Sequence, residues 1–143
     1  MLVKQISVFL ENKSGRLADV TRTLAENNIN ICALSIADTT DFGILRLIVN
    51  KPEEAEKILS DNEFTVSCTS VIAIGVEDRP GGLAKALDIL HKNNLSIEYM
   101  YAFVGKTGNE AFVILRVESP DEAIKILSRC DIALIPSQQV YCM

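Results

Sequence analysis

The sequence predicts an α+β fold: tandem ferredoxin-like βαββαβ units, antiparallel sheets with helices packed on one face. One observation is an internal repeat, in which residues 6–18 align with residues 72–84 at an offset of 66. A second is the period at which apolar residues recur in each copy. It changes along the chain between two residues, which is typical of a strand, and 3.6 residues, which is typical of a helix. We expect one unit at 1–68 and another at 69–143.

The repeat continues well beyond the first strand. Residues 25–31 fall on residues 91–97, and three of the seven positions, an Asn-Asn pair and an isoleucine, are identical. Residues 52–59 match residues 120–127 at an offset of 68, which places a two-residue insertion in the second copy between the two blocks. Self-similarity at a fixed offset indicates two copies of one structural unit.

Each copy is expected to open with a strand and a helix. Apolar residues alternate at 6–10 and again at 72–76, which predicts the first strands. After a glycine turn, apolar residues recur at helical spacing within 17–24 and 83–90, which predicts the first helices. Each helix is followed by an asparagine pair, a residue type that ends helices in the left-handed conformation. These pairs are Asn27-Asn28 and Asn93-Asn94.

A hairpin and a second helix follow in each copy. The predicted hairpin strands are 31–37 with 43–49, and 96–103 with 110–117. Pro52 and Pro120 open the second helices, where the missing N–H of proline costs nothing.

The sequence also predicts how the second helix begins and how each unit ends. Ser119 and Glu122 have the spacing of a capping box. A last strand closes each unit. Since residues 64–76 contain no proline and a single glycine, we expect the closing strand of the first copy to run into the opening strand of the second.

Composition and charge exclude several classes of function. Hydrophobic residues make up 48% and charged residues 23%, which is typical of a globular protein. The net charge of −5 is shared: residues 1–68 carry 7 Lys/Arg against 10 Asp/Glu, and residues 69–143 carry 7 against 9. Because phosphate backbones are held by clustered Lys and Arg, we expect no nucleic-acid partner and no anionic membrane surface.

Neither a targeting segment nor a membrane span is expected. The apolar N-terminus is interrupted at Lys4 and Gln5, which is unlike a secretory signal. No apolar run approaches the roughly 18 residues that a spanning helix needs. The sequence therefore predicts a cytoplasmic protein.

The cysteines predict no metal site and no cofactor. Cys32, Cys68, Cys130 and Cys142 form no C-x-x-C pair, and His91 is the one histidine of the sequence. A structural zinc site needs four ligands at close spacing, so we expect reduced thiols.

The loop between first strand and first helix is the most informative stretch. It covers residues 11–17 and, in the second copy, residues 77–83, each with glycine directly before the helix. A helix N-terminus has unpaired N–H donors and a partial positive charge, so this loop can hold a small carboxylate without a basic side chain. The alternative is a simple capped turn, because turn glycines often serve the turn alone.

These residues resemble a known family, the ACT domain. The resemblance rests on a strand, the pattern [Asn/Asp]-x-[Pro/Ser]-Gly-x-Leu, and a helix followed by Asn-Ile or Ser-Ile, twice at matched spacing. It implies ferredoxin-like regulatory modules that commonly bind amino acids between paired copies. The first copy is similar to the N-terminal module of acetolactate synthase regulatory subunits, and the whole chain to stand-alone proteins of two ACT domains.

The resemblance also implies a set of ligand-binding residues. A ligand is expected to contact Asn12, the backbone around residues 14–16, and Asn30 of the facing copy. The second copy has Asp78 and Ser96 at the two asparagine positions, and a carboxylate at Asp78 disfavours a ligand carboxylate, so the sites are not expected to be equal. The full set is Asn12, Lys13, Ser14, Gly15, Arg16, Leu17, Asn30 and Ile31, with Asp78, Pro80, Gly81, Gly82, Leu83 and Ser96.

The leading hypothesis is an amino-acid sensor that acts through ligand-dependent pairing of domains or of subunits in a homodimer. The alternative is a regulatory docking subunit of an amino-acid biosynthetic enzyme such as acetolactate synthase, without its own catalysis. We expect no enzyme, since no nucleophile is paired with a base and His91 matches no catalytic motif. Arg46 and Arg116 are expected to form surface ion pairs.

Overall fold

The computed structural model describes residues 2–11, 15–38, 42–103 and 108–141. These residues form an α+β fold, as the sequence predicts. In chain order the elements are β1 (Val3–Glu11), α1 (Arg16–Glu26), β2 (Ile31–Asp38), β3 (Phe42–Val49), α2 (Pro52–Asp61), β4 (Thr65–Glu77), α3 (Gly82–Lys92), β5 (Ile97–Ala102), β6 (Glu110–Val117), α4 (Pro120–Arg129), β7 (Ala133–Leu134) and α5 (Ser137–Tyr141).

The described residues divide into two compact units. The N-terminal unit contains residues 4–69 with Tyr141, and the C-terminal unit contains residues 2–3 with Ser70–Val140. Strand β4 belongs to both, because it is one uninterrupted strand of 13 residues. The expectation that one closing strand runs directly into the next opening strand is confirmed.

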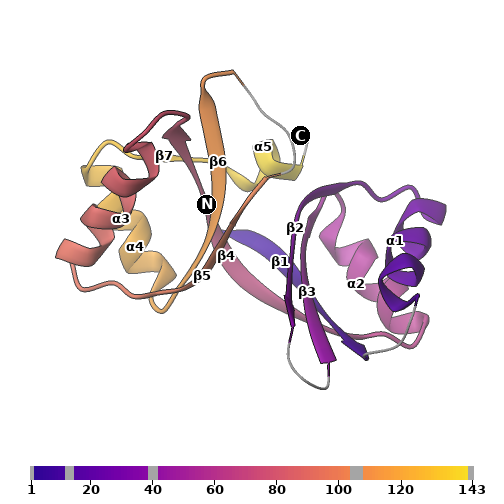
Figure 1. The fold of residues 1–143 in the computed structure, drawn as a ribbon. Helices are drawn as coiled ribbons and strands as arrows, with labels where there is room; N and C mark the ends of the chain where they lie inside the picture. Colours follow the sequence, from indigo (N-terminus) through magenta and orange to yellow (C-terminus); the bar gives the residue numbers. More distant parts are fainter. Residues whose placement is uncertain (1, 12–14, 39–41, 104–107, 142–143) are drawn as a thin grey trace. The chain divides into compact units, whose positions relative to one another are not determined.

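In the N-terminal unit the strands follow the order β2-β3-β1-β4. Strand β3 pairs antiparallel with β1, where Ile6 lies opposite Leu47, and with β2, where Leu34 lies opposite Leu47. Helices α1 and α2 both lie on one face of these strands (Figure 1). The alternation along β1 explains this arrangement, since every second side chain points to the helix-covered face.

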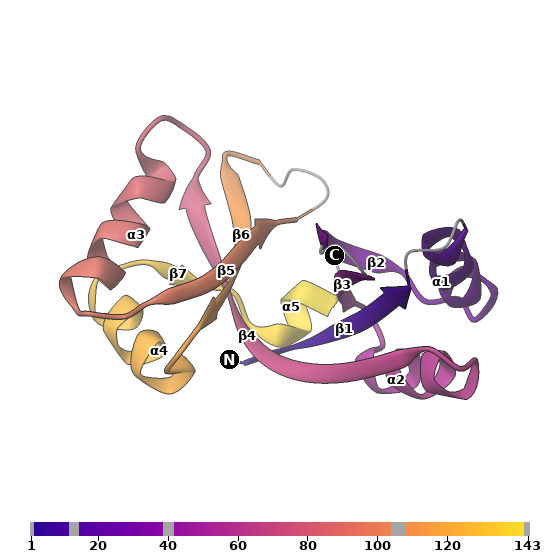
Figure 2. The ribbon, with the colours of Figure 1, turned by 60° about the horizontal axis from the view of Figure 1, so that its bottom comes forward.

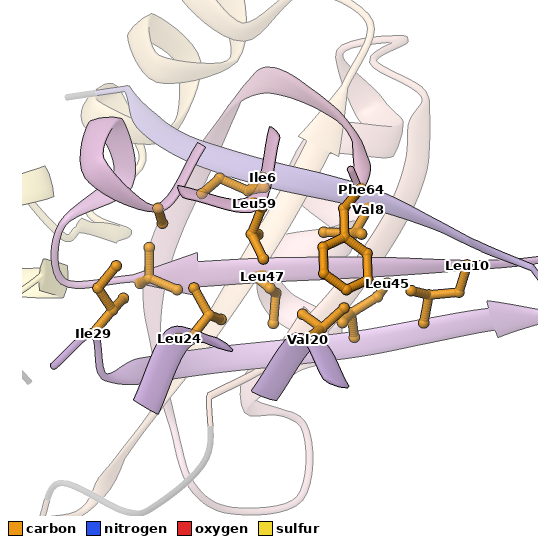
Figure 3. Packing of buried hydrophobic residues seen from close by; sticks show 12 residues of the cluster. Ile6, Val8, Leu10, Val20, Leu24, Ile29, Leu45, Leu47, Leu59 and Phe64 are labelled. Atoms are coloured by element: carbon orange, nitrogen blue, oxygen red, sulfur yellow. The ribbon is translucent and has the colours of Figure 1, made fainter. Parts of the chain in front are cut away.

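The core of the N-terminal unit lies between that face and the two helices. Val20 and Leu24 of α1 point toward Leu45 and Leu47 of β3, and all four side chains are fully buried (Figure 3). Burying a side chain of this size stabilises the fold by about 1.5–3 kcal/mol. The helical spacing of α1 thus supplies one wall of the core.

The C-terminal unit repeats the plan with a shorter closing strand. Its order is β7-β4-β6-β5, with α3 and α4 on one face (Figure 2). Ala86 and Leu90 of α3 are buried against Ile72 and Ile74 of β4. β7 is two residues long and is followed by α5, a short helix that the sequence patterns do not predict.

Most of the predicted helix boundaries are confirmed. Asn28 and Asn94 have φ angles of 58° and 57°, the left-handed stop expected after α1 and α3. Pro52 and Pro120 are the first residues of α2 and α4.

The capping box at Ser119 is wrong, because α4 has no side-chain cap hydrogen bond. The demand for a cap is smaller here for two reasons. Pro120 has no N–H to satisfy, and acidic residues in the first turn of α4 already complement the positive end of the helix.

The remaining side-chain expectations have mixed outcomes. Arg116 forms the expected surface ion pair, 3.2 Å from Glu98, and also donates to the Ser70 carbonyl oxygen at 2.9 Å. Cys32, Cys68 and Cys130 form no disulfide with another described residue, while Cys142 lies outside the described residues. Within the described part of the chain, no helix is both long and apolar enough to cross a membrane.

Candidate functional site

The two loops that the sequence singles out share one backbone feature. Gly15 and Gly81 have φ angles of 87° and 90° and directly precede α1 and α3, and neither helix has a side-chain cap. Glycine adopts this left-handed conformation without steric cost. Three of the predicted binding residues, Asn12, Lys13 and Ser14, lie outside the described residues.

The loop from β4 to α3 is folded tightly upon itself. The Arg79 N–H donates to the Glu77 carbonyl oxygen at 2.9 Å, and the Gly82 N–H donates to the Arg79 carbonyl oxygen at 3.0 Å. A Cβ atom at Gly82 would lie 2.0 Å from the Glu77 carbonyl oxygen. A side chain at position 82 therefore requires the loop to move.

A cavity of about 430 Å³ opens beside this loop, within the C-terminal unit. Its walls come from four places in the chain: the loop itself and the first turn of α3, the end of β4, the start of β6, and the turn into β7. The lining residues are Gly75, Val76, Glu77, Arg79, Pro80, Gly81, Gly82, Lys85, Glu110, Asp131, Ile132 and Ala133.

The predicted binding residues of the second copy are divided by this cavity. Pro80, Gly81 and Gly82 line it, whereas Asp78 and Leu83 do not. Leu83 packs against the hydrophobic core, and the Asp78 N–H donates to the Asn109 carbonyl oxygen at 2.9 Å. The structure therefore places Pro80, Gly81 and Gly82 at a cavity, and their contact with a ligand stays a prediction.

The cavity carries charges of both signs. Arg79 forms an ion pair with Glu77. Lys85, Glu110 and Asp131 form no ion pair with another described residue, so one ammonium and two carboxylates are available to a bound molecule. Such a mixed lining can hold a carboxylate and an ammonium at the same time.

The corresponding loop of the N-terminal unit is arranged differently. The Arg16 guanidinium lies 4.5 Å above the centre of the Phe64 ring, and its Nη1 is 4.0 Å from Asp19 Oδ2. A smaller cavity of about 170 Å³ borders Arg16 on the side of Ile36 and Leu17. Leu17 is exposed, although its helical spacing matches that of the buried Val20.

Asn30, Ile31 and Ser96 lie at the far ends of the first helices. Because α1 has 11 residues, about 16 Å of helix separates Gly15 from the position where Asn30 follows. The Asn30 N–H donates to Asn50 Oδ1 at 2.9 Å, beside a cavity of about 370 Å³. Because Asn12 lies outside the described residues, and the resemblance places Asn30 on the facing copy, a shared site at Asn12 and Asn30 stays a prediction.

Sequence reasoning missed the three charged residues that line the cavity outside the loop of residues 77–83. Lys85, Glu110 and Asp131 come from α3, β6 and the turn before β7, elements that only the fold brings together. One signal was available: Lys85 aligns with Asp19 at the repeat offset of 66, so the charge is reversed at matched helix positions.

The chain was compared with protein-family models, curated proteins and solved structures. A family model described as an ACT domain pair matches residues 1–143. No curated protein matches. Protein BT0572 from Bacteroides thetaiotaomicron is similar over 100% of this chain and 98% of its own, with 45% identity and a TM-score of 0.94.

Two more distant structures show likeness of fold alone. The regulatory subunit of aspartate kinase from Thermus thermophilus, in its ligand-free form, has 16% identity and a TM-score of 0.63 over 90% of this chain and 91% of its own. The corresponding subunit from Thermus flavus has 15% identity and a TM-score of 0.57 over 88% and 90%.

Proposed function

Since the chain belongs to the family of ACT domain pairs, whose domains are regulatory ligand-binding modules, we propose that it is a regulatory protein that binds a free amino acid. The observation that carries this proposal is the cavity of about 430 Å³, where Lys85, Glu110 and Asp131 form no ion pair with another described residue. Ligand cavities typically measure about 300–1,000 Å³, so the size suits a small molecule.

The charges of the cavity match those of an amino-acid zwitterion. The ligand carboxylate accepts hydrogen bonds from the Lys85 ammonium and from first-turn N–H groups of α3, which have no side-chain cap. The ligand ammonium donates to Glu110 and Asp131. Charge-assisted hydrogen bonds of both kinds are roughly twice as strong as neutral ones.

The regulatory action follows from differential affinity. A ligand shifts an equilibrium between two arrangements of domains or of subunits only by as much as it prefers one of them. We propose that the chain acts as a homodimer whose pairing responds to the bound amino acid. Coupling of about 1–3 kcal/mol is typical for such effects.

A thermal-shift screen of the intact chain against the common amino acids tests the proposal. Binding to the native state adds about 2.7 kcal/mol of stability at a hundredfold excess over the dissociation constant. Lys85→Ala is expected to abolish the shift, and Asp19→Ala, at the matched position of the N-terminal unit, to leave it. Absence of a shift with every amino acid would contradict the proposal, whereas loss with Asn12→Ala or Asn30→Ala would return the site to those positions.

A docking function is the second candidate, and the outer strand β2 favours it. Leu34 and Ile36 on this strand are 37% and 45% exposed, and β2 stands at one end of the strand order. Apolar side chains on a sheet-edge strand offer a surface to a partner protein. The partner in this case is an amino-acid biosynthetic enzyme such as acetolactate synthase.

A pull-down from native lysate separates the two candidates. A large enzyme captured in fixed stoichiometry, and lost with Ile36→Lys, supports docking. A chain that elutes as a homo-oligomer without such an enzyme argues for the sensor.

A further inference from the structure

The two units can be compared position by position beside their first loops. Arg16 and Gly82 are the first residues of α1 and α3, each preceded by a left-handed glycine. Because they also match at the repeat offset of 66, they occupy corresponding places in the two units.

A second pair of corresponding residues faces the first. Phe64 and Ile132 match at the offset of 68. Each follows a residue with positive φ, 68° at Glu63 and 61° at Asp131. Each also donates its backbone N–H to a carbonyl oxygen near the end of the preceding helix, at 3.0 Å and 3.2 Å.

In the N-terminal unit a side chain fills the space between these two positions. The Arg16 guanidinium covers the Phe64 ring, whose exposed fraction is 7%, and Arg16 Nε is buried without a hydrogen-bond partner among the described residues. A cation over an aromatic face gains about 0.5–1 kcal/mol at exposed sites and more when it is desolvated. In the C-terminal unit Gly82 has no side chain, and Gly82 and Ile132 both line the open cavity.

The residue one turn further along each first helix also differs in charge between the two units. Asp19 Oδ2 lies 4.0 Å from Arg16 Nη1, and Asp19 Oδ1 accepts a hydrogen bond from Arg22 at 3.1 Å, so the N-terminal unit supplies its own cations to this carboxylate. Lys85 occupies the matching position of α3 and forms no ion pair with a described residue. The anion that this lysine lacks is the group that a ligand carboxylate supplies.

We infer that Arg16 is an intramolecular occupant that closes the N-terminal counterpart of the cavity, so that each chain binds one amino acid, in the C-terminal unit. This inference rests on the proposed function and adds its stoichiometry and its location. It differs from a shared site at Asn12 and Asn30, because the residues that contact the ligand, Lys85, Glu110 and Asp131, all belong to one unit.

Isothermal titration of the full chain tests the inference with the amino acid that gives the largest thermal shift. The unsubstituted chain is expected to bind one equivalent. Ala133→Tyr places a ring in the cavity and is expected to weaken binding at least about tenfold, which is 1.4 kcal/mol. The matched control is Thr65→Tyr at the corresponding exposed position, expected to stay within about twofold.

A complementary variant opens the N-terminal unit. Arg16→Gly, Asp19→Lys and Phe42→Glu together give the N-terminal unit the glycine and the charges of the C-terminal cavity. Phe42 matches Glu110 at the offset of 68, and Glu63 already matches Asp131. This triple variant is expected to raise the stoichiometry from one to two. Asp19→Lys with Phe42→Glu, which keeps the guanidinium in place, is expected to stay at one. Circular dichroism of each variant confirms that it is folded.

The outcomes separate the inference from the proposed function. Two equivalents bound by the unsubstituted chain, or binding lost with Thr65→Tyr and kept with Ala133→Tyr, would overturn the inference and leave amino-acid binding standing. A triple variant that is folded and still binds one equivalent would overturn the role of Arg16. An unsubstituted chain that binds no amino acid overturns the inference and the proposed function together.

Discussion

Replacing Gly82 by alanine tests how the loop between β4 and α3 is built. The new Cβ atom would lie 2.0 Å from the Glu77 carbonyl oxygen and 3.0 Å from its carbon, whereas ordinary contact begins at 3.4 Å. The loop must therefore move by about 1.4 Å, the difference between 3.4 Å and 2.0 Å. Because both atoms are backbone, no side-chain rotation relieves the contact.

The expected loss of stability follows from two opposing terms. Overpacking that shifts backbone costs about 1–3 kcal/mol and occasionally more, and alanine in a helix gains up to about 1 kcal/mol over glycine. We expect the free energy of unfolding of Gly82→Ala to fall by about 2 kcal/mol. With a urea m-value of about 2 kcal/mol/M, the unfolding midpoint falls by about 1 M.

Gly75→Ala is the matched control for this measurement. Its Cβ would meet three side-chain atoms, each at 3.4 Å, so we expect a change within about 1 kcal/mol. A Gly82→Ala chain as stable as the unsubstituted protein would show that the loop yields freely, and the reasoning from the Glu77 contact would be wrong. Loss of ligand binding without loss of stability would place the effect in the cavity alone.

Three further predictions concern the N-terminal unit and its counterpart. Leu24→Ala and Leu90→Ala, at matched and fully buried positions, should each lower the free energy of unfolding by about 2–5 kcal/mol in urea titrations, and a loss below about 1 kcal/mol would contradict the described cores. Burial and a hydrogen bond to the Glu56 carboxylate raise the pKa of the Cys68 thiol from 9.0 to about 11. Because the thiol of the unfolded chain ionises first, stability should fall as pH rises from 9.0 to about 11, and melting curves of Cys68→Ser should lack this fall. Iodoacetamide should label Cys68 faster at pH 9 in Glu56→Gln than in the unsubstituted chain. Tyr141→Phe removes the hydroxyl oxygen that accepts a hydrogen bond from the Lys4 N–H at 2.8 Å, and should lower the free energy of unfolding by about 1 kcal/mol. Unchanged stability in thermal unfolding would contradict this role of the bond.

The order of the elements within each unit could be predicted because local and repeated signals agree. The strand alternation at 6–10, the left-handed stop at Asn28 and the proline at position 52 each indicate an element boundary, and each recurs in the second copy at a matched offset. Consistency between local preference and global fold is what makes such inference work. One copy alone would have left the order of the strands open.

The closing elements of the C-terminal unit were beyond sequence reasoning. A two-residue strand such as β7 carries no period to detect, and a five-residue helix such as α5 is shorter than two turns. The capping box at Ser119 failed for another reason, since matching residues at the right spacing do not fix the side-chain rotamer. In these three cases tertiary packing, and not the local sequence pattern, determines the structure.

The sequence indicated the glycine loops of the candidate site but not the charged residues of the cavity outside them. The left-handed glycines Gly15 and Gly81 are visible in sequence, because few other residues tolerate their backbone conformation. The charged residues that line the cavity outside the loop of residues 77–83, Lys85, Glu110 and Asp131, are spaced by more than twenty residues in the chain, and nothing in their local sequence marks them. The fold, and not a motif, makes them neighbours.

The differences between the two loops depend on one another. An aspartate at the Lys85 position beside Gly82 would leave the open cavity with carboxylates and no unpaired ammonium, which repels the carboxylate of an amino acid. A lysine at the Asp19 position beside Arg16 would place like charges three residues apart on one helix, a pairing that destabilises helices by a few tenths of a kcal/mol.

Each unit therefore carries a self-consistent pair of residues. Arg16 with Asp19 fills the space over Phe64 with an internal ion pair, and Gly82 with Lys85 leaves a space that needs an external anion. Because Arg16 and Asp19 form an ion pair, their substitutions are expected to be non-additive in a double-mutant cycle. In the proposed arrangement, the Arg16 side chain fills the space in the N-terminal unit, and the C-terminal unit keeps its cavity open. One ligand per chain is then sufficient, although both units have the same fold.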